Sequence, residues 1–339
     1  MVKSISNNSL FENIRSLLLS SRQNVLRYVN TTMVHTYYEI GRIIVEDEQQ
    51  GSIRAEYGKQ TLKELSLKLI NEFGKGFSVD NLENMRQFYL TYSKGQTLSA
   101  QSKNSETLSR RFKLSWSHYV FLMRQDEPIR RFYEIEAIEN SWSLRELERQ
   151  FNSMLYERLS LSRDKKKILE LSKKGQVVER PEDLIKDPYV FEFLGLKEDK
   201  TYSESDLESK LIENLKRFLL ELGKGYTFVA RQQRISFDEE HFFIDLVFYN
   251  RLLRCFIVFD IKTEKLKHQD LGQLQMYVNY YDRTVKTKDE NKTIGILLCT
   301  DKNNAVVKMT LPEDNDQVFA SKYKLYLPTK EELLKQLNI

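Results

Sequence analysis

The chain has 339 residues, which is too long for one typical domain and suits two domains that each bury a core. Lysine and arginine number 53 against 49 acidic residues, and the net charge of +4 permits nucleic-acid binding without establishing it, because such binding depends on where the charges lie. No apolar run approaches membrane-spanning length, and the four His and two Cys lack zinc-ligand spacing, which argues against a membrane protein and a zinc protein.

The two cysteines indicate the compartment. Cys255 and Cys299 lie in apolar, strand-like surroundings, and the N-terminus carries no signal-like apolar segment. We therefore expect reduced, buried thiols in a cytoplasmic protein.

The first 160 residues are predicted to be almost wholly helical. The polar stretch 93–110 interrupts them and is expected to be a flexible loop or a disordered insertion. We expect one all-helical domain over residues 9–160. Its amphipathic segments are 9–48, 59–73, 78–92, 115–124, 127–139 and 143–159.

Two places in this domain are typical of a helix-turn-helix. In the first, a turn at 74–76 and a cap at Ser78 lead into a helix with Leu82 on its inner face. Asn84 and Gln87 lie on its outer face, and such amide side chains can pair with adenine edges in a major groove. This helix is therefore a candidate for nucleic-acid binding.

In the second, a turn at 140–142 leads to a capping box, Ser143-x-x-Glu146, and a helix with Arg145 and Arg149 on its outer face. Helix-turn-helix geometry is also a common way to pack three helices of any function, and a charged outer face is often only solvated. A downstream domain that itself acts on nucleic acid would favour nucleic-acid binding for both places.

A charged linker is expected over residues 161–185, followed by a second domain over 186–339. The clusters Lys165–Lys167 and Lys173–Lys174 are expected to be solvated linker charge, with phosphate contacts as the alternative.

The second domain begins with a helix predicted from about Ser205 to Leu222, whose apolar residues form one stripe. Glu208 lies inside this stripe and could point at a metal beside a sheet, whereas Glu213 lies on the opposite, solvated side. Because Ser205-x-x-Glu208 is also a capping box, Glu208 could instead serve only its own helix start.

Segments 241–249 and 253–262 are dense in β-branched and aromatic residues and predict a hairpin. Each strand carries one acid, Asp245 and Asp260, with fourteen residues between them. Because side chains alternate across a strand, Asp260 and Lys262 are expected to share a face.

This pattern suits a hard divalent ion. Mg²⁺ prefers oxygen ligands and keeps several waters, so Asp245 and Asp260, with the Ile261 carbonyl, would make an open site. Lys262 would hold or deprotonate a metal-bound water, or neutralise a phosphate. The plainer alternative is an edge-strand salt bridge, because Asp-x-Lys is a common tripeptide.

The segments around the hairpin add further candidates. Arg231 and Arg234, on a preceding strand, are candidates for gripping a nucleic-acid backbone. A helix predicted at 268–282 places Gln273 and Tyr277 four residues apart on one face. After it we expect strands at 293–300 and 323–327 and a last helix from Thr329.

A helix with Glu, three strands that carry Asp and Asp-x-Lys, and a helix with Gln-x-x-x-Tyr together resemble the PD-(D/E)XK nuclease superfamily. Over nearly the whole chain, the sequence resembles the YhcG-type nuclease family of bacterial and phage proteins. The segments that carry the resemblance are Phe218–Gln233, Ile244–Asn250 and Gly272–Tyr277.

The resemblance implies an α+β protein with an N-terminal winged helix-turn-helix-like domain and a C-terminal αβββαβ domain like that of restriction endonucleases. The family usually has Glu-Leu-Lys where this chain has Asp260-Ile261-Lys262. Superfamily members use either acid, so the shorter Asp changes the metal distance without removing a ligand. By resemblance, the catalytic core is Asp245, Asp260 and Lys262, and the supporting residues are Glu208 and Gln273, with Gln275 as the rival of Gln273.

The leading hypothesis is an endonuclease that depends on Mg²⁺ or Mn²⁺, with nucleic acid as partner and DNA expected ahead of RNA. Two alternatives are a non-cleaving DNA-binding or assembly protein that keeps a nuclease fold, and a junction resolvase acting as a homo-oligomer. The intact set of two acids and a lysine argues against the first alternative.

Overall fold

The computed structural model describes residues 3–50, 55–93, 112–161, 165–196, 201–237, 240–327 and 329. The chain divides into two compact units, Met1–Leu144 and Arg145–Ile339, whereas the sequence predicts a division after residue 160. Within the described ranges, no helix combines the length and the apolar composition that a membrane crossing needs.

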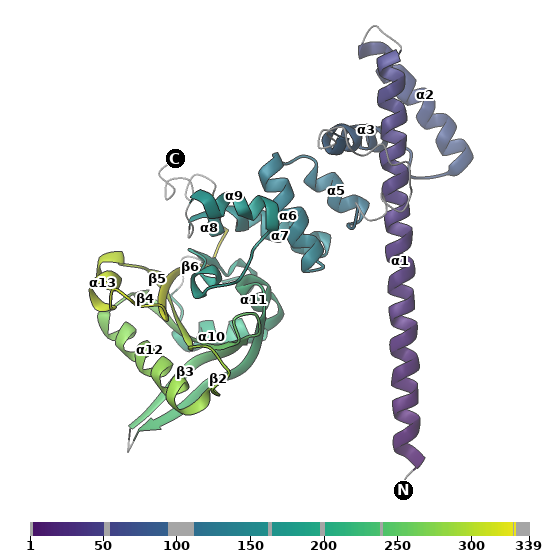
Figure 1. The fold of residues 1–339 in the computed structure, drawn as a ribbon. Coiled ribbons are helices and arrows are strands. Elements are labelled where there is room, and N and C mark those ends of the chain that lie inside the picture. The colour runs from purple at the N-terminus through teal and green to yellow at the C-terminus, as the bar shows by residue number, and fades with distance from the viewer. Residues whose placement is uncertain are drawn as a thin grey trace. The chain divides into compact units, whose positions relative to one another are not determined.

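The first unit is helical, as the amphipathic pattern predicts. Most of its helices are within a few residues of the predicted bounds. They are α1 (Lys3–Gln50), α2 (Ala55–Phe73), α3 (Val79–Ser93), α5 (Trp116–Leu122) and α6 (Glu127–Glu139) (Figure 1).

Close packing fixes α3 against its neighbours. The ring of the buried Phe88 lies 5.8 Å from Tyr38 of α1 and 5.3 Å from Trp116 of α5, centroid to centroid. A Cβ atom at Gly41 of α1 would lie 2.0 Å from the carbonyl oxygen of Met85, so glycine is what allows the backbones of α1 and α3 to approach.

The first predicted helix-turn-helix is present as two helices joined by a turn. Gly74 and Gly76 adopt φ values of 82° and 117° there, which glycine reaches without strain. Leu82 is buried, Gln87 is exposed and Asn84 is half-buried, as the phasing of α3 predicts. No strand occurs among the described residues of this unit, so they show no wing.

The second unit is a mixed sheet between helices. Its helices are α7 (Leu144–Asn152), α8 (Leu155–Leu161), α9 (Lys165–Lys174), α10 (Glu204–Glu213), α11 (Leu215–Leu222), α12 (His268–Tyr280) and α13 (Asn304–Thr310), with short turns η1 (Pro181–Leu184), η2 (Glu192–Leu194) and η3 (Tyr281–Val285). Its strands are β1 (Tyr189–Val190), β2 (Tyr226–Phe237), β3 (Glu240–Asn250), β4 (Cys255–Lys265), β5 (Ile294–Asp301) and β6 (Val318–Lys324).

The strand order is β1-β6-β5-β4-β3-β2, with antiparallel pairing from β2 to β4 and parallel pairing from β4 to β1. Side chains of β4 alternate between the two faces of this sheet. Phe259 and Ile261 pack with α10 and α11, whereas Val258 packs with α12. Asp260 and Lys262 have the same parity as Val258, so they extend the α12 face of β4.

Two predicted helices are each broken in two. The helix predicted at 205–222 ends at Asn214, and α11 then begins. Ser203 caps α10 by accepting a hydrogen bond from Asp206 N, so the predicted capping box of Ser205 with Glu208 is wrong. The helix predicted at 143–159 is likewise divided into α7 and α8, with Met154 at a φ of 54° between them.

The strands predicted at 241–249, 253–262 and 293–300 are confirmed as β3, β4 and β5. The last strand, β6, lies several residues before its predicted place at 323–327. Three predictions lie outside the described residues, apart from single residues at their edges: the loop at 93–110, the side chains of Lys165–Lys167 and the helix from Thr329.

Candidate active site

Two acids and a lysine come together on neighbouring strands, Asp245 on β3 and Asp260 and Lys262 on β4. Lys262 Nζ lies 3.2 Å from Asp260 Oδ2. Regular pairing of β3 with β4 stops at Leu246 and Phe259, and beyond that point Asp245 Oδ2 accepts a hydrogen bond of 2.7 Å from the backbone N–H of Ile261. The backbone pairing of the two strands therefore ends where the acids lie. There the Asp245 carboxylate accepts the hydrogen bond of the Ile261 N–H.

Both carboxyl groups have perturbed acidity. Burial, and then the charge of Asp245, raises the pKa of Asp260 to about 7, although Lys262 acts in the opposite direction. Burial also raises the pKa of Asp245 to about 6, against the lowering effects of the Ile261 N–H and Lys262. Asp260 Oδ2 is buried, and apart from its ion pair with Lys262 it has no hydrogen-bond partner among the described residues. The site thus holds a carboxylate oxygen that lacks a full set of partners.

Glu208 reaches the site through a bridging amide. Its side chain is 2% exposed and accepts hydrogen bonds from Arg231 Nε and Gln232 Nε2. Gln232 Nε2 also lies 3.2 Å from Asp245 Oδ1. Gln232 has a φ of 47°, a left-handed conformation that is uncommon for a residue with a side chain. Glu208 therefore lies one side chain away from Asp245 and does not touch it.

Glu204 is a site residue that the sequence reasoning missed, as is Gln232. Glu204 Oε2 lies 3.5 Å from Lys262 Nζ, from the first turn of α10. Glu204 and Glu208 are four residues apart, and this spacing places both on one helix face. The spacing was a usable signal, whereas nothing in the sequence distinguishes Gln232 from Gln233.

On α12, the geometry favours Gln273 over Gln275. Gln273 Nε2 donates to Tyr277 Oη, which in turn donates to Phe243 O at 3.0 Å. Gln275 instead contacts Asn279 at 3.3 Å. Among the described residues, Gln273 donates to Tyr277 and makes no hydrogen bond to Lys262.

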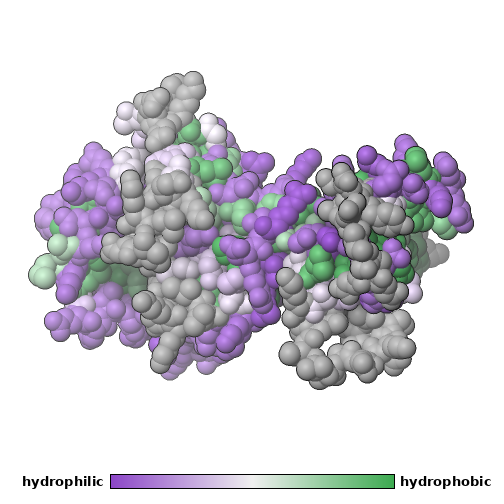
Figure 2. Space-filling model, turned by 90° about the horizontal axis from the view of Figure 1, so that it is seen from above, coloured by the Kyte–Doolittle hydropathy of each residue, from purple (hydrophilic) through white to green (hydrophobic). Residues whose placement is uncertain are grey.

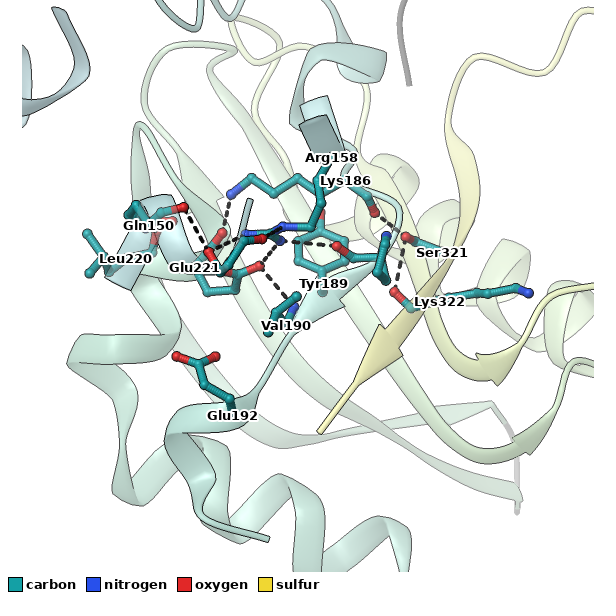
Figure 3. Close-up of polar contacts among 12 residues, drawn as sticks. Gln150, Arg158, Lys186, Tyr189, Val190, Glu192, Leu220, Glu221, Ser321 and Lys322 are labelled. Carbon is teal, nitrogen blue, oxygen red and sulfur yellow. Dashed lines mark hydrogen bonds and ion pairs between the residues drawn. The ribbon is translucent and has the colours of Figure 1, made fainter. Parts of the chain in front are cut away.

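Arg149 does not lie on an exposed face, and the prediction that it does is wrong. Its guanidinium contacts Glu192 at 2.7 Å and the fully buried Glu221 at 3.4 Å. Arg158 and Lys186 also converge on Glu221 (Figure 3). Burial alone raises the pKa of Glu221, but these three cations outweigh it and lower that pKa to about 2.

The other predicted nucleic-acid contacts are placed differently. Arg145 is exposed on α7. Arg231 is committed to Glu208 and to Ser209 Oγ at 2.8 Å, so it is not free to grip a backbone in this conformation. Arg234 is exposed and lies 2.8 Å from His241 Nε2.

The residues present fit a divalent ion held by few protein ligands. Asp260 supplies a buried carboxyl group whose Oδ2 is contacted by Lys262, and Asp245 lies close enough to raise the pKa of that carboxyl group. In the described ranges, no three His, Cys, Asp or Glu side chains are grouped as a metal site. The Glu208 carboxylate is bound to Arg231 and Gln232. Mg²⁺ commonly takes one or two carboxylates and completes its shell with water, which this donor set permits.

Two family models match the chain. The family described as "YhcG PDDEXK nuclease domain" matches residues 182–338, and the family described as "DUF1016 N-terminal domain" matches residues 13–158. The protein named "Putative nuclease YhcG" of Escherichia coli (strain K12) is 40% identical over 349 residues, which cover 97% of this chain and 92% of that protein.

Solved structures give only a weak likeness. A structure described as a repair endonuclease from Pyrococcus abyssi is 19% identical with a TM-score of 0.27, and it covers 39% of this chain and 50% of its own. The structure of an EndoMS complex with double-stranded DNA is 17% identical with a TM-score of 0.28, covering 40% and 49%. Likenesses of this size carry no argument about this chain.

Proposed function

The chain belongs to the YhcG PDDEXK nuclease family, and on this premise we propose that it is a divalent-metal-dependent endonuclease that hydrolyses phosphodiester bonds in DNA. The observation that supports this most is the buried carboxyl group of Asp260, whose Oδ2 forms an ion pair with Lys262 at 3.2 Å and whose pKa is raised by the neighbouring Asp245. A salt bridge alone would not need a second acid beside it, because the charge of Asp245 raises the pKa of Asp260 and so disfavours the ionised form that pairs with Lys262.

Asp245 and Asp260, with the Ile261 carbonyl, would hold Mg²⁺ or Mn²⁺. When bound, such an ion would activate a water and stabilise negative charge on the phosphate. Burial lowers the pKa of Lys262, but the charges of Asp260 and Glu204 outweigh this and raise it. A lysine with a raised pKa is protonated at neutral pH, so Lys262 is better suited to neutralising the phosphate than to removing a proton.

Glu208 and Gln273 would support this site from its two sides. Glu208 acts on Asp245 through Gln232, which contacts both carboxylates. Gln273 acts through Tyr277, whose hydroxyl anchors on the backbone of β3 at Phe243. Such supporting contacts typically change metal affinity or activity by about 10- to 100-fold when they are removed.

Recognition would come from exposed and half-buried polar groups outside the site. Asn84 and Gln87 on the outer side of α3 suit contacts with base edges, and Arg145 and Arg234 suit contacts with phosphates. Both cysteines are free and buried, which suits a reducing compartment, and we place the protein in the cytoplasm.

The test is a cleavage assay on duplex, single-stranded and branched DNA and on RNA, each with Mg²⁺, Mn²⁺ or EDTA. We expect duplex DNA to be cut with either ion and left intact in EDTA. Lys262→Ala should abolish cutting, whereas Lys265→Ala, on an exposed lysine of the same strand, should not. Cleavage that survives Lys262→Ala would refute the assignment, and binding of DNA without any cleavage would favour the non-cleaving alternative.

A further inference from the structure

An exposed apolar stripe runs along the N-terminal half of α1. Its residues recur at alternating steps of three and four, which is the a/d pattern of a coiled coil. The five apolar members are between 48% and 74% exposed. With Phe11 at position a, the stripe is Phe11, Ile14, Leu18, Ser21, Val25 and Tyr28.

This stripe is a different face from the one that packs inside the first unit. Further along α1, the buried residues Val34, Tyr38 and Val45 occupy positions c and g of the same heptad register, and the buried Ile44 occupies position f. At 100° per residue, the two faces are roughly 110° apart around the helix. Figure 1 shows the N-terminal half of α1 extending beyond α2, α3 and α5. The helices of its own unit therefore leave the stripe uncovered.

The stripe is large enough to form a stable interface. Together with Leu10, Leu17 and Val29, it presents eight exposed apolar side chains. At roughly 100 Å² each they offer about 800 Å², which matches the area that one partner buries in a standard interface. Monomers commonly show no apolar patch beyond about 300–600 Å². On the face drawn in Figure 2, hydrophilic residues predominate and hydrophobic areas lie between them.

The occupant that fits is a second copy of the same helix. A heptad stripe is completed by another heptad stripe, and α1 is self-complementary when two copies run parallel. In that orientation position g of one helix faces position e of its partner, five residues on, so Leu10 and Leu17 would lie under the stems of Arg15 and Arg22. In an antiparallel pair, position e of one helix would instead face position e of its partner, so Arg15 and Arg22 would lie near the same arginines of the second copy. We propose that residues 10–29 of α1 form a parallel, two-stranded coiled coil between two copies of this chain.

Sedimentation equilibrium of the full chain tests the dimer. We expect the unaltered protein to be a dimer at micromolar concentration, and Leu18→Glu with Val25→Glu, both at position a, to convert it to a monomer. Leu19→Glu is the matched control, because Leu19 is also 50% exposed but lies at position b. A monomeric unaltered protein, a double variant that stays dimeric, or a trimer would overturn the proposal.

Disulfide trapping tests the orientation and does not depend on how the charged variants fold. In a parallel pair, Ile14→Cys at position d brings two thiols together, and mild oxidation should link two chains. Ser16→Cys, at the outer position f, should give no linked chains. The native Cys255 and Cys299 are 1% and 0% exposed and do not interfere. Equal linking of both variants, or none at Ile14→Cys, would overturn the parallel arrangement.

Discussion

At the scale of single residues, Asp260 is buried in the middle of β4 in a place that is unfavourable for its ionised form. Its carboxyl group is buried beside Asp245, and only Lys262 opposes the resulting repulsion. Strained or unsatisfied groups of this kind cluster at functional sites, because a bound ligand relieves them.

The acidity of Asp260 predicts a pH-dependent stability. Its pKa of about 7 in the folded chain lies above the ordinary value of 3.8, so the stability that its proton contributes is present at low pH and is lost as the pH rises through 7. In EDTA, Asp260→Asn should therefore stabilise the protein at pH 8 by about 1–3 kcal/mol, and by less at pH 5. Thermal unfolding at both pH values measures this, and a gain that is equal at both would contradict it.

For Gln232 we predict a functional loss, because its side-chain amide contacts Asp245, one of the proposed metal ligands. Gln232→Ala removes the bridge between Glu208 and Asp245, and cleavage should fall by about 10- to 100-fold. Gln233→Ala is the control, since Gln233 is exposed and its side chain donates to the Arg234 carbonyl oxygen at 3.3 Å. Equal activity of both variants in the plasmid cleavage assay would show that the bridge has no role.

At the scale of elements, regular structure is what the sequence predicts well. Alternation along β4 correctly placed Asp260 and Lys262 on one face, and the apolar stripe correctly placed Glu208 inside the unit. Gln232 escaped prediction because its direction depends on a left-handed φ within β2. Arg149 was misplaced because helix phasing identifies the polar side of α7 but not the buried Glu221 that faces it.

Because Arg149 is bound to Glu192 and Glu221, we now predict that its substitution lowers the stability of the protein and leaves DNA binding unchanged. Removing its guanidinium leaves Glu192 and part of the charge on Glu221 without a partner, which should cost about 1–3 kcal/mol. Urea unfolding of Arg149→Ala measures this, with the exposed Arg145→Ala as control. If Arg149→Ala unfolds like the unaltered protein yet binds DNA more weakly, the original prediction was right.

At the scale of the whole molecule, α7 and α8 pack with the sheet although the N-terminal family model extends to residue 158. Arg158 of α8 is fully buried against Glu221 of α11, and Gln150 of α7 donates to Leu220 O at 3.1 Å. These contacts tie α7 and α8 to α11 within the second unit.

Truncation tests this division of the chain. A fragment of residues 145–339 should fold cooperatively, whereas one of residues 186–339 leaves Glu221 buried without Arg158 or Arg149 and should be markedly less stable. Circular dichroism melts of the two fragments compare them. Equal stability of the fragments would place the boundary after α8, as the sequence predicts.

The central claim is that Asp260 and Asp245 hold a divalent ion, and Mn²⁺ binding followed by electron paramagnetic resonance tests it most directly. At pH 8 the unaltered chain should bind Mn²⁺, excess Mg²⁺ should displace it, and Asp260→Asn should lose the binding. Glu213→Gln, on the exposed side of α10, should bind as the unaltered chain does. Undiminished Mn²⁺ binding by Asp260→Asn, or no binding by the unaltered chain, would contradict the account.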